Sequence, residues 1–412
     1  LDLLLLYYQK RPDLFEQFCS VYAGRFEVNL DSPRFGYFTQ SEVVKNLCEA
    51  VNAAPEDRNL LTLFVHVADH FLKLDVSKAE GGRHNTVSFY TLTLSPDQPV
   101  LEYRKMLWSQ LYQIYQRGAV QDEIEQILYR YGMPCYNVDA GLDVVRAEFE
   151  DVLKFFDLFQ LENLFHCVIA AHIKQVAKRI DYSELDILTP FLNSEKYKIY
   201  SALAPDFSEY DSEEYEKGIQ RHQERVCKLV EQYTPRDIDG LIQVCLESCQ
   251  TFDKEARELS TGLGYVFEAL QDQQQLYLYL ADAYMKADTP YKIYAGQILE
   301  RLFEIKPALE VKKFITQYRY NQQNVWLWFF FVFMPEQQVS VHWAAELLQY
   351  LSTPDVEMEA SPYRRIDSLR KYESVEPGII FKALRTVADH YEESPYVFNL
   401  YAYWVLNHRN QQ

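Results

Sequence analysis

Glycine is scarce in this chain, which has 13 glycines among 412 residues. That is about half of the usual share of roughly 7%. Sheet-rich and α/β folds use glycine at turns, bulges and phosphate-binding loops, so its scarcity favours helices joined by short turns. The phosphate-binding string G-x-x-x-x-G-K-[ST] is also missing from the sequence. At Gly262 and Gly264, which form a lone Gly-x-Gly, we therefore predict a helix kink or a close helix contact and no nucleotide site.

Basic residues are also fewer than acidic ones. The chain has 41 basic and 60 acidic residues, which gives a formal net charge of −19. A surface of this sign repels phosphate backbones, so the composition argues against nucleic acid as a partner. It favours a protein partner, particularly a basic one.

Paired cysteines and long apolar runs are two further absences. The seven cysteines are an odd number and are scattered, which argues against a disulfide framework and for a reducing cytoplasm. The most apolar run, residues 325–334, has half of the roughly 20 residues that a membrane-spanning helix needs. We expect a cytoplasmic chain with no membrane segment. Because it begins with what reads as mid-helix and without an initiator Met, we interpret it as a piece of a longer polypeptide.

Apolar residues recur at helical spacing along most of the chain. Val145, Phe149, Val152, Phe156 and Phe159, for example, step by four and three residues in turn, as on one face of a helix. Successive helices with short connections predict an all-α fold, an α-solenoid of degenerate helix-pair repeats of the tetratricopeptide or HEAT kind. One short segment near residues 84–94 is β-branched and aromatic, and we predict an extended β segment there.

Four groups of residues could carry chemistry, and each has a simpler interpretation. His66 and His70 share a helix face, but a metalloprotease motif needs Glu where this sequence has Val67, so we predict surface histidines. Cys167 and His172 are about 140° apart around a helix, which argues against a Cys–His pair and for a core histidine.

The other two groups are a cysteine pair and an acidic run. Cys245 and Cys249 lie one helical turn apart, but no second pair completes a zinc site. Acids at Glu213, Glu214 and Glu216 lack the D-D-x-x-D string of diphosphate-binding helical enzymes, so we interpret them as a solvated charge run. The sequence thus predicts no catalytic residue, no metal ligand and no cofactor in this chain.

One polar segment is a candidate for partner binding. Tyr, Trp and Arg dominate the energetics of protein interfaces, and binding residues often lie on a loop at the end of a rigid helix. The apolar run that follows this segment, including Trp326, reads as core. The candidate binding residues are Tyr318, Arg319, Tyr320, Asn321, Gln322, Gln323 and Asn324.

The first 115 residues carry a family resemblance. Its elements are Arg11-Pro12, the turn at residues 35–37 with Gln40, the extended arm at residues 86–94, and Arg104-Lys105 with Trp108. This series resembles the segment that follows the ATPase module in large bacterial STAND-type NTPases, some of which are Avs-type antiviral defence proteins. The resemblance implies that the ATPase and effector modules lie upstream of this chain. It also implies that the helical repeats bind a phage protein and so trigger oligomerisation of the full-length protein.

On this basis we expect three regions and keep three functional hypotheses. The regions are residues 1–115, which carry the resemblance, helical repeats at 116–205, and C-terminal helical repeats at 206–412, which begin with the acidic stretch at residues 206–216. The first hypothesis is a ligand-sensing region of a STAND-like defence NTPase. The second is a helical-repeat scaffold that binds proteins without switching. The third, an all-helical enzyme, requires a closed pocket with convergent polar groups.

Overall fold

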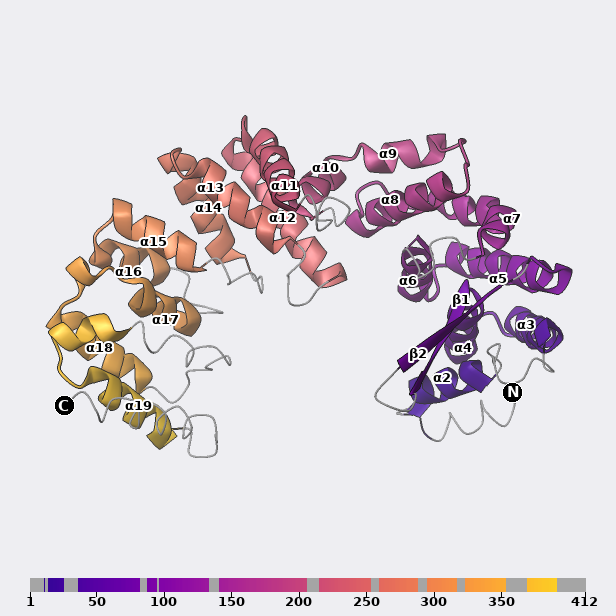
Figure 1. The fold of residues 1–412 in the computed structure, drawn as a ribbon, viewed down its shortest axis with the longest axis horizontal. Helices are drawn as coiled ribbons and strands as arrows, with labels where there is room; N and C mark the ends of the chain where they lie inside the picture. The colour runs from indigo at the N-terminus through magenta and orange to yellow at the C-terminus, as the bar shows by residue number, and fades with distance from the viewer. Residues whose placement is uncertain are drawn as a thin grey trace. The chain divides into compact units, whose positions relative to one another are not determined.

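The computed structural model describes residues 11, 14–25, 36–81, 87–94, 96–132, 141–205, 215–252, 259–287, 295–316, 323–352 and 369–390. The chain divides into two compact units, Leu1–Lys198 and Ile199–Gln412 (Figure 1). Within the described residues both units are built from helices, and the first also contains one pair of strands. The all-helical character predicted from apolar spacing is confirmed, since the helices account for nearly all of the described structure.

The first unit contains eight complete helices in its described part, and a ninth begins in it. They are α2 (Phe15–Arg25), α3 (Gly36–Ala53), α4 (Arg58–Phe71), α5 (Gln98–Gln116), α6 (Gln121–Gly132), α7 (Leu142–Leu153), α8 (Leu164–Arg179), α9 (Thr189–Leu192) and α10 (Glu195–Leu203). The strands β1 (Asp75–Gly81) and β2 (Val87–Thr93) lie between α4 and α5 in the sequence. Short 3₁₀ turns cover Lys154–Asp157 and Asp186–Leu188.

The second unit continues with helices of similar length. They are α11 (Tyr215–Val230), α12 (Pro235–Thr251), α13 (Ser260–Leu270), α14 (Gln274–Lys286), α15 (Ala295–Ile305), α16 (Ala308–Thr316), α17 (Gln323–Phe333), α18 (Val341–Leu351) and α19 (Ile379–His390). A 3₁₀ turn at Glu336–Gln338 follows α17.

Helices pack on their near neighbours in chain order. In the first unit α3 contacts α5, α4 contacts α6, α5 contacts α7 and α6 contacts α8. In the second unit α11 contacts α13, α12 contacts α14 and α15 contacts α17. Contacts between elements one or two places apart are expected when each helix pair buries its apolar face against the next pair. The predicted face of α7 and the turn after it follows this rule, because Val145, Phe149, Val152, Phe156 and Phe159 are all buried.

The strands form a two-stranded antiparallel sheet. Asp75 pairs with Thr93 and Gly81 pairs with Val87. Strand β2 lies within the segment near residues 84–94 for which the sequence predicts extended structure. Its partner β1 has no comparable run of β-branched and aromatic residues, so sequence reading passed over it.

Helix α4 is more deeply enclosed than its sequence predicts. Helical spacing in its sequence predicts one apolar stripe through Leu61, Phe64 and Phe71, but Leu60, Leu63 and Val67 are buried too. Those additional residues are covered because α4 contacts α2, α3, α5 and α6. A helix with neighbours on several sides must be apolar on several sides, whatever its strongest stripe.

The two compact units divide the chain differently from the three regions expected from sequence. Their boundary falls between residues 198 and 199, inside α10. Residues on both sides of position 115 belong to the first unit, where α5 packs on α7. The acidic stretch at residues 206–214 lies outside the described residues.

Candidate functional site

A buried arginine organises the end of α4. Arg104, on α5, is fully buried, and its guanidinium donates to three successive carbonyl oxygens. The acceptors are Phe71 at 3.0 Å, Leu72 at 3.0 Å and Lys73 at 3.2 Å. These carbonyls end a helix and have no partner within it, so Arg104 supplies the hydrogen bonds that they lack. The arginine thereby holds the connector that leaves α4 for β1.

Glu148 on α7 balances the charge of this arginine. Its two carboxylate oxygens accept from Nε and Nη2 of Arg104, both at 2.7 Å. Burial alone would lower the pKa of Arg104, but the adjacent carboxylate of Glu148 raises it above its usual value. The ion pair joins residues 44 positions apart, and with its carbonyl contacts Arg104 links α4, α5 and α7 into one assembly.

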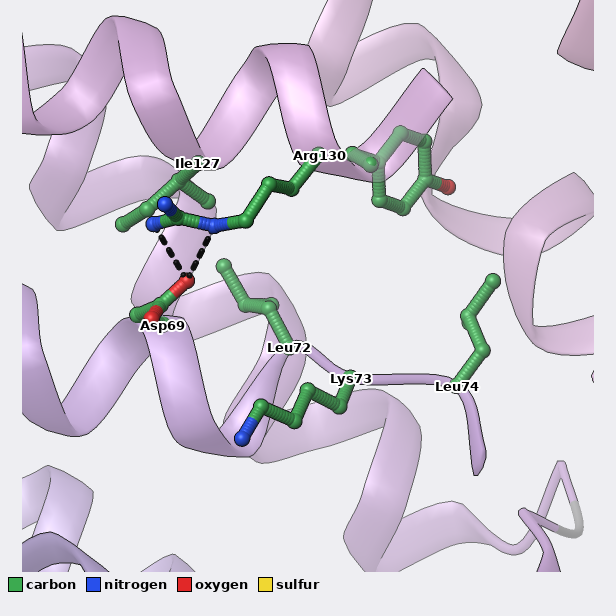
Figure 2. Close-up of a pocket in the computed structure, with 7 residues that line it drawn as sticks. Asp69, Leu72, Lys73, Leu74, Ile127 and Arg130 are labelled. Atoms are coloured by element: carbon green, nitrogen blue, oxygen red, sulfur yellow. Dashed lines mark hydrogen bonds and ion pairs between the residues drawn. The ribbon is translucent and has the colours of Figure 1, made fainter. Parts of the chain in front are cut away.

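A solvent-open cleft lies beside this assembly, between the end of α4 and α6. It has a volume of about 370 Å³, and α6 contributes Ile127, Arg130 and Tyr131 to its lining. In Figure 2, Leu72 and Leu74 project from the connector toward the helix that carries Arg130. The cleft is therefore an apolar slot with a polar rim.

The rim carries a fixed ion pair. Nη2 and Nε of Arg130 donate to the same carboxylate oxygen of Asp69, at 2.8 and 3.2 Å (Figure 2). Arg130 remains half-exposed, with 50% of its side chain accessible. Burial, and then the negative charge of Glu148, raise the pKa of Tyr131 well above its usual value, so this phenol stays neutral at physiological pH. Apolar groups beside an oriented guanidinium and a tyrosine are typical of protein-binding hot spots.

The candidate binding segment of the sequence falls mostly outside the described residues. Tyr318, Arg319, Tyr320, Asn321 and Gln322 are in that part of the chain. Gln323 and Asn324 begin α17. The apolar run that follows is core in part, since Trp328, Phe330, Phe331, Val332 and Met334 are buried whereas Leu327, Phe329 and Phe333 are half-buried. The side chain of Trp326 lies outside the described residues.

The structure separates the residues of the suggested Cys–His pair. Cys167 Sγ lies 3.2 Å from the hydroxyl oxygen of Ser194, whereas Nδ1 of His172 lies 3.5 Å from the carbonyl oxygen of Tyr129. His172 also packs on the Tyr129 ring, with centroids 4.7 Å apart. Burial lowers its pKa, which favours the neutral imidazole. The predicted core position is wrong in degree, because His172 is half-buried, and its ring nitrogen contacts the carbonyl oxygen of Tyr129 at the edge of the packed region.

The other candidates from the sequence are the histidine pair, the cysteine pair and the acidic run. His66 and His70 are half-buried on α4, and Cys245 and Cys249 are buried on α12. In the described part of the chain no three or more His, Cys, Asp and Glu residues are grouped as a metal site would require. Glu213 and Glu214 lie outside the described residues, while Glu216 is exposed in the first turn of α11.

The Gly-x-Gly sequence marks a close helix contact, as predicted. A Cβ placed on Gly262 would lie 2.2 Å from the carbonyl oxygen and 2.5 Å from the Cα atom of Leu203. Only glycine fits there, because those atoms belong to the backbone of α10 and cannot rotate away.

A buried network of Tyr115, Glu125 and His166 was missed by sequence reading. Tyr115 donates to Oε1 of Glu125 at 2.8 Å, and Nε2 of His166 lies 3.0 Å from the same oxygen. Nδ1 of His166 accepts from the backbone N–H of Gln160 at 2.8 Å, so in the neutral ring the proton is on Nε2 and points to Glu125. These residues come from α5, α6 and α8, and no local spacing signals their meeting.

In the described residues the chain is a mainly helical protein with one two-stranded sheet, whose helices pack in chain order and leave an open, partly apolar cleft between α4 and α6. Of the residues on which the family resemblance rests, Gln40, Arg104 and Trp108 are buried, whereas Arg11 and Lys105 are exposed. No helix in the described residues combines the length and apolarity needed to cross a bilayer. The chain matches no family model, no curated protein and no solved structure.

Proposed function

We propose that this chain is a protein-binding region built as an α-solenoid of degenerate helix-pair repeats. The observation that carries the proposal is the cleft of Figure 2, where Arg130 and Tyr131 line an apolar slot. One wall is the end of α4 with its connector, which Arg104 holds, and the other is α6, which the Asp69–Arg130 ion pair joins to α4. A preformed surface loses little conformational entropy on binding, so a folded protein partner is the ligand class that it suits.

The proposal extends to a sensor role within a larger protein. The resemblance of residues 1–115 supports a ligand-sensing region of a STAND-like antiphage NTPase, in which binding of a phage protein triggers oligomerisation. The full open reading frame should then encode a P-loop upstream of this chain. A reading frame without a P-loop would remove the sensor role and leave the second hypothesis, a binding scaffold that does not switch.

The cleft can be tested with a matched pair of arginine variants. Arg130 and Arg146 are about equally exposed, and each is paired with an aspartate, but only Arg130 lines the cleft. Exposed ion pairs contribute at most about 1 kcal/mol, so both variants should fold. We expect Arg130→Ala to weaken binding of a protein retained from phage-infected cells by roughly tenfold, as loss of an interface arginine does. Arg146→Ala should bind like the wild type.

The measurement is titration of the purified retained protein against each variant. A crosslinkable amino acid placed at position 130 should also react with that protein, whereas the same group at position 146 should not. Equal binding by Arg130→Ala and the wild type would show that the cleft is not the contact surface. The candidate segment is tested in the same assay with Arg319→Ala and Tyr320→Ala.

A further inference from the structure

We propose that the ends of α11, α12, α13 and α14 form a second binding surface, which takes an extended basic segment of a protein partner. The inference rests on the proposed protein-binding function and gives the chemistry of one ligand. Sequence reading passed over this region. Its distinguishing feature is a run of amides at the turn between α13 and α14, Gln273, Gln274 and Gln275.

Two open hollows lie next to each other at this place. The first, of about 490 Å³, is lined by Tyr233, Tyr279 and all three glutamines, and the second, of about 550 Å³, runs along α11. Gln273 lines both hollows, so an extended segment that passes over Gln273 would reach each of them, and we call the two hollows together the groove. Helix α11 packs on α13, α12 on α14 and α13 on α14, and these contacts set the spacing of its walls.

The lining suits a peptide main chain. Each glutamine amide can both donate and accept a hydrogen bond, and all three side chains are exposed. An extended segment offers alternating N–H and C=O groups along its length, which amides can match without reading particular side chains. The hydroxyl of Tyr279 donates to Asp239, with both carboxylate oxygens at 3.0 Å, so its ring is held beside the groove.

The charges around the groove favour a basic ligand. Glu224 and Lys228 on the exposed face of α11, and Glu231 directly after the helix, line the second hollow. The lining of the groove thus has two carboxylates and one ammonium group, and the carboxylate of Asp239, which accepts from Tyr279, adds negative charge beside it. The whole chain carries a formal charge of −19, so the long-range field has the same sign. Lysine or arginine side chains of a bound segment would lie near these carboxylates.

The test uses random dodecapeptides displayed on phage and selected against the whole chain. We expect the selected peptides to be rich in Lys and Arg and to bind more weakly at high salt. Synthetic copies should bind Glu224→Lys/Glu231→Lys at least tenfold more weakly than the wild type. The triple variant Gln273→Ala/Gln274→Ala/Gln275→Ala should also lose at least tenfold, because it removes the hydrogen-bonding groups without changing charge.

A control variant separates the groove from general charge. Glu150→Lys/Glu184→Lys changes net charge by the same amount at two exposed positions of the first unit, and it should bind like the wild type. Three results would contradict the proposal of a groove for a basic segment. They are an equal loss of peptide affinity in both charge variants, selected peptides that are acidic or neutral, and unchanged peptide affinity in the triple glutamine variant. If those results are obtained but binding of the retained protein still depends on Arg130, only the groove proposal fails and the proposed function stands. If the wild type binds neither peptides nor a protein, both proposals fail.

Discussion

Arg104 shows how one side chain can decide a local structure in this protein. Its guanidinium has five N–H donors, and four of its nitrogen–oxygen contacts reach Phe71, Leu72 and Glu148. A lysine could not replace it, because an ammonium group cannot form the two parallel bonds to Glu148. The arginine–lysine pair at positions 104 and 105 belongs to the family resemblance, and at position 104 its role is to hold the fold.

Removing Glu148 should be costly. Glu148→Ala leaves the buried guanidinium of Arg104 without its counter-charge, and we expect the free energy of unfolding to fall by about 3–5 kcal/mol. Urea unfolding followed by tryptophan fluorescence measures this loss. Asp143→Ala, which removes the carboxylate of an exposed pair with Arg146, should cost less than about 1 kcal/mol. A Glu148→Ala protein as stable as Asp143→Ala would contradict the assignment.

At the scale of the element, the way helices approach one another depends on residue size at the contact. Gly262 on α13 lies against the backbone of Leu203 at the end of α10. Gly240 is also within a helix, α12, but no atom lies within 4 Å of a Cβ placed there. Both glycines thus lie within helices, but only Gly262 is in close contact with another helix.

These glycines make a matched pair for mutation. Gly262→Ala should force α13 away from α10 and reduce the free energy of unfolding by about 1–3 kcal/mol, as overpacking does. Gly240→Ala should increase it by up to about 1 kcal/mol, because alanine has the higher helix propensity. Thermal unfolding of the two variants should give melting temperatures that move in opposite directions. A neutral Gly262→Ala would mean that the contact is loose.

At the scale of the whole molecule, buried tyrosines link stability to alkaline pH. Burial is the largest cause that raises the pKa of Tyr115 and Tyr131 in the first unit, and of Tyr277 and Tyr372 in the second. In the unfolded chain a tyrosine has a pKa of about 10. Above that pH the folded state holds these protons more tightly than the unfolded state does. The contribution of these protonated tyrosines to the free energy of unfolding is therefore complete below about pH 10 and is lost as the pH rises further.

The expected result is alkaline unfolding in two stages. Exposed members of the 32 tyrosines should ionise near pH 10 while helicity is retained. The buried ones should ionise only as helicity falls, which absorbance at 295 nm and circular dichroism at 222 nm follow together. Tyr277→Phe removes one of these phenols and should move the loss of helicity in the second unit to higher pH. Ionisation of every tyrosine near pH 10 with constant helicity would refute this account.

The sequence by itself determined the class of fold and the position of several helices. Apolar spacing at Val145, Phe149 and Val152 is local information, and these residues are buried where the helix predicts. For Gly262 the sequence left a helix kink and a close helix contact as alternatives, and the structure shows the contact. Local patterns succeed here because the period of a helix determines which side chains share a face.

Only the tertiary structure decided which side chains meet across those helices. Arg104 and Glu148 are 44 positions apart, and Glu125 and His166 are 41 positions apart. The burial of Leu63 and Val67, outside the predicted stripe, depends on which helices surround α4. The cleft at Arg130 and the groove at Gln273 arise in the same way, from the packing of several helix ends. The period of a helix determines which of its side chains lie on one face. Which element that face contacts is determined by packing among segments that are distant in the sequence.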